Sequence, residues 1–336
     1  MSATSTARRP PTVQERLQVP TDVRVKTIKG RRLVRDRIDT AAMILAFLVA
    51  MVPLLFVVGA LVSHGGRVIG LGFLTRDIPT TASAGEIQGN CSLQLKYGGT
   101  CAHAVVAAAR PGMGPAVVGT LITTGLSALM AIPLGILAAV YLNEYGKARR
   151  LARVIRFLSD IMTGVPSVVM GIFIYTLWVL SFGQGQSALA AGLALACLML
   201  PIVVRSSEEM LRLVPSALRE GSAALGARTW KTTARVVLPS ALAGLVSGAM
   251  LAVARAAGET APVLFTIGAA TTVASASTVT GQSTTLSFKI YQLITNGGRL
   301  SPQMAWGAAL TLILIVFIFT VLARLATAFL ARRQAA

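Results

Sequence analysis

Six long apolar stretches constrain the fold of this chain more than any other feature of its sequence. They cover residues 40–62, 116–142, 157–182, 188–204, 239–268 and 304–330. A helix rises about 1.5 Å per residue, so each stretch can cross a hydrocarbon core of about 30 Å, although the fourth only just does. With 54% hydrophobic and only 13% charged residues, the chain carries more apolar surface than a water-soluble domain can hide. The sequence therefore predicts an all-α, polytopic membrane protein with six transmembrane helices.

Basic residues are distributed unevenly between the two sides of this predicted bundle. With the N-terminus inside, 24 of the 31 Lys and Arg residues fall on the inner side and six on the outer side. Cytoplasmic loops carry an excess of Lys and Arg, so this distribution predicts that both termini are cytoplasmic. It also accounts for the formal net charge of +19 without any role for nucleic acid.

The apolar stretches divide the chain into segments. Residues 1–38 are polar and basic and are interpreted as a disordered cytoplasmic tail, with contact to anionic lipid as an alternative. The first helix, at 39–62, is too long for a signal-peptide core and is interpreted as a retained anchor. An outer loop at 63–115 follows, in which Cys91 and Cys101 form either a disulfide or two free thiols. Residues 116–330 form a five-helix core with a cytoplasmic loop at 206–238, and residues 331–336 form the cytoplasmic C-terminus.

A short basic segment between the fourth and fifth apolar stretches predicts two helices joined by a turn. Pro215 suits the start of a helix. Proline has no backbone N–H, and the first N–H groups of a helix have no intrahelical partner in any case. Gly226 suits its end, because glycine adopts the left-handed conformation at little cost. Thr229 is predicted to cap a second helix, which carries Trp230 and enters the membrane at Pro239. A DNA-binding helix-turn-helix is excluded, because the flanking apolar stretches hold the segment at the membrane surface.

The segment from Glu220 to Pro239 resembles the cytoplasmic loop of bacterial ABC importer permeases. That family's pattern is E-A-A, three residues, G, nine residues and I-x-L-P. The spacing from Glu220 through Gly226 to Pro239 matches it, with two small residues in place of the alanines and a valine in place of the isoleucine. The resemblance implies that this loop docks in a groove on an ATPase and moves the fourth and fifth spans. The residues implied in docking are Glu220, Ala223, Leu225, Gly226, Trp230 and Pro239.

The fifth apolar stretch contains charged residues, which are rare inside membrane spans and face the bundle interior or a water-filled cavity. On one helix, Gly244, Gly248, Ala252, Arg255 and Glu259 fall within an arc of about 80°. The small residues allow close helix packing, and the last two can form an i,i+4 ion pair. Two interpretations stay open. The pair is only structural, or the planar guanidinium of Arg255 contacts an anion such as phosphate while Glu259 orients it.

Residues 254–262, with the sequence ARAAGETAP, resemble the A-R-A-x-G-E-T-A-P signature of PstA-type phosphate permeases. Residues 284–293 resemble that family's T-T-L…I-Y-Q-L segment, and residues 164–167 its G-V-P-S stretch. This resemblance extends from residue 119 to the C-terminus. It implies a bacterial cell-membrane permease whose substrate path is lined by Arg255, Glu259, Thr163, Ser167 and Thr260. The implied partners are a PstC-type second permease, a PstB-type ATPase dimer and an external PstS-type phosphate-binding protein.

The sequence contains no P-loop pattern, no metal-ligand spacing, no dinucleotide fingerprint and no nucleophile with a placed base. It therefore predicts a non-catalytic subunit that binds no metal or cofactor and relies on ATP and magnesium held by partner ATPase subunits. Two other functions stay open: a permease for another oxyanion, and a proton-coupled secondary transporter that uses Glu259 as the proton carrier.

Overall fold

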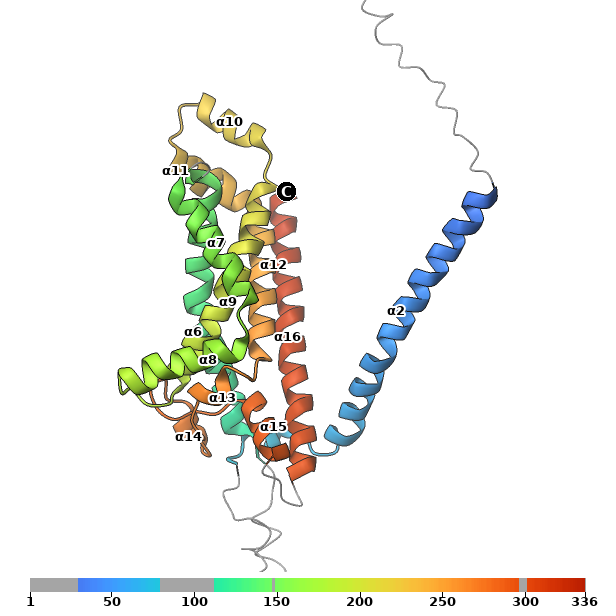
Figure 1. The fold of residues 1–336 in the computed structure, drawn as a ribbon, viewed down its shortest axis with the longest axis vertical. Helices are drawn as coiled ribbons and strands as arrows, with labels where there is room; N and C mark the ends of the chain where they lie inside the picture. Colours follow the sequence, from blue (N-terminus) through green and yellow to red (C-terminus); the bar gives the residue numbers. More distant parts are fainter. Residues whose placement is uncertain (1–29, 79–111, 147–148, 296–300, 336) are drawn as a thin grey trace, which may run out of the picture. The chain divides into compact units, whose positions relative to one another are not determined.

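The computed structural model describes residues 30–78, 112–146, 149–295 and 301–335 (Figure 1). All regular elements in these residues are helices, so the predicted all-α fold is confirmed. Five helices are long and apolar enough to cross a membrane, and a bent pair brings the number to as many as six. The chain divides into two units, Met1–Val57 and Val58–Ala336.

The first unit contains most of helix α2 (Gly30–Gly65). Its apolar part, Val34–Gly65, extends beyond the predicted 40–62 at both ends, and none of its most apolar window is buried. The last turns of α2 belong to the second unit, where His64 stacks on Trp306 of α16 (Ser301–Ala335) with ring centroids 5.1 Å apart. Residues 1–29, in the predicted tail, lie outside the described residues, and so do Cys91 and Cys101.

The second unit is built around α6 (Gly114–Val140), α9 (Ala188–Arg212), α12 (Leu238–Ala257) and α16, which run side by side in Figure 1. The predicted small-residue face of α12 packs on α9. A β-carbon at Gly248 would lie only 2.6 Å from Ser206 Oγ, and one at Gly244 only 2.5 Å from Met210 Sδ. Ala252, on the same face, is buried. The two glycines therefore make room for the side chains of Ser206 and Met210 on α9.

The third apolar stretch, which the sequence predicts as one span over residues 157–182, is broken into two parts. Helix α7 (Arg150–Gly164) and the pair formed by α8 (Ser167–Ile174) and η2 (Tyr175–Ser181) meet at an angle of 106°. Pro166 causes the break, because a proline pushes the preceding residue out of the helical region. Val165 accordingly has φ −71° and ψ 127°. Figure 1 shows α7 running along the bundle and α8 turning across it.

The fifth apolar helix is also shorter at its outer end than the predicted 239–268. It ends at Ala257, with Gly258 as its C-cap, and only the short α13 (Val263–Thr266) follows Pro262. Glycine weakens a helix and proline removes a backbone donor, so the chain leaves the helix here. At the inner end, α11 (Thr229–Thr232) and η3 (Thr233–Val237) continue into α12, and the whole apolar segment covers Thr229–Ala257.

The loop between α9 and α12 forms the predicted pair of helices. Helix α10 (Ser216–Ala224) has Pro215 as its N-cap and is followed by Gly226, whose φ of +75° is left-handed, as predicted. The Gly226 N–H donates to Ala223 O at 2.9 Å and the Ala227 N–H to Ser222 O at 3.1 Å, which is a Schellman turn. The predicted cap at Thr229 is wrong: Arg228 is the N-cap of α11, and its side chain makes no capping bond.

The opposite end of the second unit carries short helices. These are α3 (Leu71–Thr75), α14 (Val273–Ala276) and α15 (Leu286–Thr295). Figure 1 shows α14 and α15 at the far end of the bundle from α10. The spans thus separate two surfaces, one that carries the loop helix α10 and one that carries the short helices α14 and α15.

Candidate functional site

A cavity of about 280 Å³ lies where the α7–α8 bend faces α9 and the outer end of α12. Its polar lining consists of four side chains: Thr163, Ser167, Arg255 and Glu259. These are four of the five residues predicted for the substrate path. Thr260, the fifth, does not line the cavity. The break at Pro166 is what brings the end of α7 and the start of α8 to one wall.

The charged pair of the cavity is loosely held. Arg255 Nε lies 3.7 Å from Glu259 Oε1, so the predicted i,i+4 ion pair is present. This distance is too long for a hydrogen bond. The Arg255 side chain is 69% exposed and that of Glu259 is 25% exposed. The sequence predicts that one continuous helix carries both residues. This prediction is wrong, because Glu259 lies two residues beyond the end of α12. The carboxylate of Glu259 therefore attracts the guanidinium of Arg255 without a hydrogen bond, and the N–H groups of the guanidinium can donate to an anion.

The backbone beside the cavity is held by the first residues of α15 and by Thr284, which lies just before them. Ser287 Oγ donates to Glu259 O at 3.0 Å, and the Leu286 N–H donates to Thr120 Oγ1 at 2.9 Å. A β-carbon on Gly119 would overlap the carbonyl oxygen of Thr284, so this segment packs directly on the α6 backbone. The threonine-rich stretch therefore fixes the position of the Glu259 backbone.

Lys289, on α15, was not singled out from the sequence. Burial lowers the pKa of its ammonium group, and its Nζ donates to Gln292 Oε1 at 3.4 Å. The signal for it was present, because an outer-side lysine sits in the stretch between the T-T-L and I-Y-Q-L segments. It adds a positive group two residues from Ser287.

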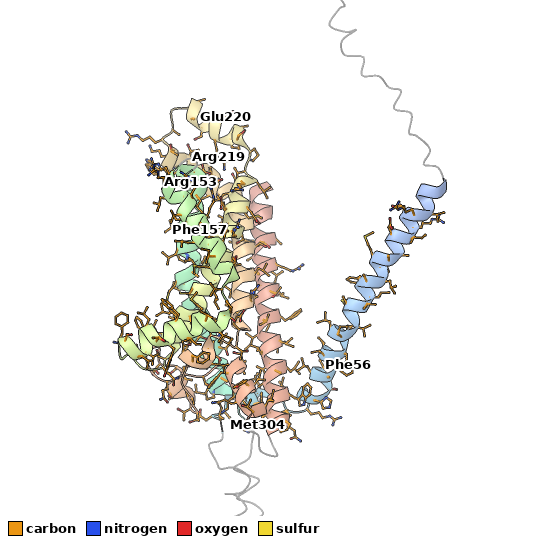
Figure 2. The ribbon with its side chains drawn as sticks, in the orientation of Figure 1. Phe56, Arg153, Phe157, Arg219, Glu220 and Met304 are labelled. Carbon is orange, nitrogen blue, oxygen red and sulfur yellow. The ribbon has the colours of Figure 1, made fainter. Side chains whose placement is uncertain are left out.

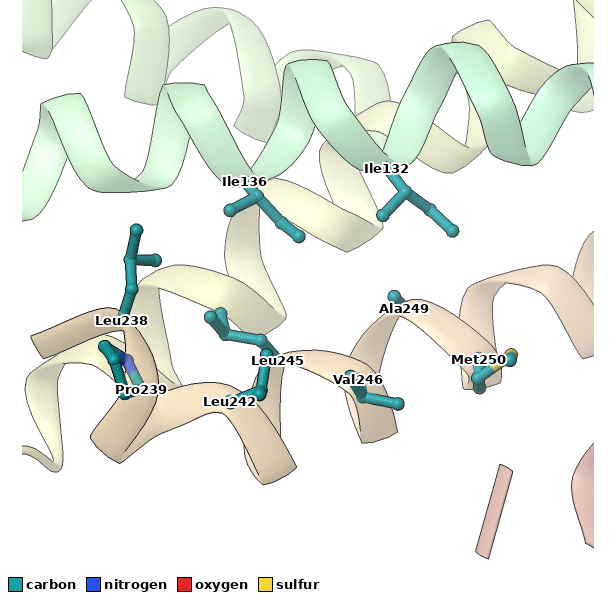
Figure 3. A pocket seen from close by; sticks show the side chains of 9 residues that line it. All are labelled: Ile132, Ile136, Leu238, Pro239, Leu242, Leu245, Val246, Ala249 and Met250. Carbon is teal, nitrogen blue, oxygen red and sulfur yellow. The ribbon is translucent and has the colours of Figure 1, made fainter. Parts of the chain in front are cut away.

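A second and larger cavity, of about 420 Å³, opens between α6 and α12 (Figure 3). Figure 3 shows that its nine lining side chains are all apolar, among them Ile132, Leu242 and Val246. It offers an anion neither a side-chain donor nor a charge. Pro239, predicted for ATPase coupling, lines this cavity. Within the described part of the chain, no three His, Cys, Asp or Glu side chains lie together as metal ligands would.

The other residues predicted for coupling are exposed on the loop between α9 and α12. No residue of α10 is buried, and Leu225 is 90% exposed. Glu220, Ala223, Gly226 and Trp230 are exposed as well. Figure 2 shows Glu220 on α10, beyond the end of the bundle.

The loop is anchored by an ion pair that sequence reasoning missed. Arg219 Nη2 lies 2.9 Å from Glu144 Oε1, and Arg219 Nε donates to both carboxylate oxygens at 3.3 Å. Glu144 belongs to η1 (Tyr141–Tyr145), which continues α6. The available signal was an acid at the end of an apolar stretch and an arginine beside Glu220, but 75 residues separate the two.

The fold and the loop define a class: a membrane permease of a binding-protein-dependent importer. Residues 131–335 match the family described as "binding-protein-dependent transport system inner membrane component", and the chain belongs to this family. Two solved structures share the fold. The MetNI methionine ABC transporter matches with a TM-score of 0.54 and 20% identity over 65% of this chain and 97% of that one. A bacterial alginate ABC transporter matches with a TM-score of 0.57 and 15% identity, over 87% of this chain and 94% of that one.

Curated relatives have a higher sequence identity to this chain than the two solved structures do. The chain is 40% identical over 286 residues to phosphate transport system permease protein PstA 1 of Mycobacterium tuberculosis H37Rv, which covers 85% of each chain. It is 38% identical to phosphate transport system permease protein PstA of Mycobacterium leprae, over 87% of this chain and 88% of that one. The chain is 37% identical to phosphate transport system permease protein PstA of Pasteurella multocida, over 64% of this chain and 75% of that one.

Proposed function

We propose that this protein is the membrane permease subunit of an ATP-driven importer of inorganic phosphate and provides half of the translocation pathway. The observation that carries the proposal is the cavity in which Arg255 and Glu259 face two hydroxyl side chains. The phosphate-transport names of relatives that are about 40% identical support the choice of substrate.

The cavity suits brief contact with a hydrated oxyanion. The planar guanidinium of Arg255 can donate two parallel hydrogen bonds to phosphate oxygens. Ser167 adds a hydroxyl donor to the lining, whereas the Thr163 hydroxyl donates to Asp160 O at 2.7 Å. Glu259 repels the anion and shortens its stay, and it accepts a hydrogen bond from monohydrogen phosphate. Sulfate has no such proton at neutral pH, so Glu259 favours phosphate over sulfate.

The energy for transport comes from partner subunits, since this chain has no P-loop and is non-catalytic. A PstB-type ATPase dimer, which binds ATP and magnesium, docks on α10, Leu225 and the turn at Gly226. A PstC-type permease supplies the other half of the pathway, and a PstS-type binding protein delivers phosphate to the outer face. Both termini lie in the cytoplasm. Closure of the ATPase dimer shifts the population from inward-open to outward-open packing.

The proposal is tested with the complete assembly in proteoliposomes that hold ATP on the ATPase side. Arg255→Ala is expected to lower the initial rate of labelled phosphate uptake about ten- to hundredfold, the size expected for losing a charged hydrogen bond. Arg324→Ala is the matched control, because Arg324 is also an exposed arginine on an apolar helix but lies away from the cavity. Parental uptake by a correctly assembled Arg255→Ala complex would overturn the proposal.

The same vesicles separate the two alternatives. Labelled sulfate or another oxyanion that enters faster than phosphate would identify a different substrate. If collapse of the proton gradient at constant ATP abolishes uptake, Glu259 acts as a proton carrier and the protein is a secondary transporter.

A further inference from the structure

Two carboxylates at the cytoplasmic end of the bundle are almost completely buried. The side chain of Glu144 is 6% exposed and that of Glu208 is 5% exposed. A buried carboxylate is costly unless it is paired and hydrogen-bonded. Both are paired with arginines from other helices, so the chain brings several elements together at this point.

The first pair connects the loop helix to the end of the second span. Arg219 belongs to α10 and Glu144 to η1. Besides its bonds to the carboxylate, Arg219 donates from Nη1 to Val214 O at 2.7 Å and from Nη2 to Leu211 O at 2.9 Å. Asn143 Nδ2 donates to Glu144 Oε1 at 2.7 Å. The guanidinium is therefore held in one orientation and ties α10 to η1.

The same short helix η1 is tied to α7 by a second arginine. Arg156 Nη2 donates to Leu142 O at 3.2 Å, and Arg156 Nε donates to Glu208 Oε1 of α9 at 3.0 Å. Leu142 lies two residues before Glu144. A continuous series of bonds thus leads from α10 through η1 to α7, in addition to the backbone links of the loop to α9 and α11.

Helix α7 carries this connection to the candidate site. Arg156 and Thr163 lie on the same helix, about 10 Å apart at the helical rise. Thr163 and Met162 line the charged cavity, and the chain bends directly after them. A shift of α7 at its cytoplasmic end therefore moves one wall of the cavity relative to Arg255.

We propose that Arg219 and Glu144 are positioning residues for transport, which carry the movement of α10 to α7 and so to the Thr163 wall of the cavity. This inference rests on the proposed function, because it requires an ATPase to act on α10. It adds a third moving element to the fourth and fifth spans, which the loop joins through the backbone. Coupling of this kind needs an element that both sites bias, and in this proposal that element is α7, which ends at the bend.

The experiment uses the full assembly with Glu144→Gln, Arg219→Gln and the double variant. Each single variant is expected to lower phosphate transported per ATP hydrolysed about tenfold, within the usual range of coupling free energies. The double variant is expected to lower it no further, because the two residues act as one pair. Arg153→Gln is the matched control, since Arg153 is an exposed arginine three residues from Arg156 on α7 and is expected to keep parental coupling.

A second measurement separates coupling from a merely structural role. In a background without the three native cysteines, Met162→Cys reports on the cavity wall through its rate of reaction with a small maleimide. ATP with vanadate is expected to change this rate about fivefold in the otherwise parental complex. The change is expected to disappear with Glu144→Gln and to persist with Arg153→Gln. If Glu144→Gln does not assemble, Glu144→Asp, which keeps the charge but shortens the side chain, takes its place.

The outcomes distinguish the two proposals. If Glu144→Gln or Glu144→Asp complexes transport and label like the parental complex while Arg255→Ala does not transport, the inference is wrong and the proposed function stands. Additive losses in the double variant also overturn the inference. If nucleotide changes neither uptake nor labelling in the parental complex, the proposed function itself fails.

Discussion

Replacement of Gly226 tests the turn on which the proposed docking surface depends. Gly226 has φ +75°, and no neighbouring atom lies within 4 Å of the position of a β-carbon. A larger residue therefore meets open space, and its cost comes from its own backbone. That cost is about 1–2 kcal/mol for a residue with a β-carbon in the left-handed conformation. It lowers the equilibrium constant for forming the Schellman turn by a factor of about 5–30.

The assay for this prediction compares uptake and ATP hydrolysis in reconstituted complexes. Gly226→Val is expected to reduce phosphate transported per ATP while the chain stays in the membrane, and Gly226→Asn is expected to be milder because asparagine tolerates this conformation. Gly221→Ala is the matched control. Gly221 lies inside α10, also in open space but without a positive φ, so alanine there stabilises the helix by about 0.5–1 kcal/mol. Parental coupling with Gly226→Val would show that transport does not depend on the left-handed turn at Gly226.

Three further variants test other parts of the structure. Gly119→Ala forces a β-carbon onto the carbonyl oxygen of Thr284, so thermal unfolding in detergent is expected to show a loss of about 1–3 kcal/mol. Asp160→Asn breaks the ion pair with Arg205, which is about half exposed, and the same assay is expected to show a change below about 1 kcal/mol; a larger loss would contradict this. Pro166→Ala permits α7 to continue towards α8, and phosphate uptake is expected to fall because the cavity wall moves; unchanged uptake would show that the bend does not need proline.

Local signals made much of the fold predictable. Gly226 could be identified as the end of a helix because only glycine adopts that turn cheaply, and the small face of α12 followed from helical spacing. The break of the third stretch and the early end of the fifth were missed. Proline and glycine are tolerated within membrane helices when neighbours satisfy the backbone, and the sequence does not show whether the neighbours do so at Pro166 or Gly258.

The candidate site was predictable where residues stand close in sequence, as Arg255 and Glu259 do. The pairing of Arg219 with Glu144 was not, because it depends on how the end of α6 lies against the loop, and helical periodicity gives no relative register of two helices. For the same reason, the sequence could not show that Thr163 and Ser167 line one cavity with Arg255 while Thr260 does not.

The most direct test of the central claim is the initial rate of labelled phosphate uptake by the complete assembly, measured with and without ATP for the parental protein and for Arg255→Ala. ATP-driven import past Arg255 predicts uptake that requires ATP, persists when the proton gradient is collapsed and falls about ten- to hundredfold in the variant. Uptake without ATP, or equal ATP-driven uptake by both proteins, would contradict it.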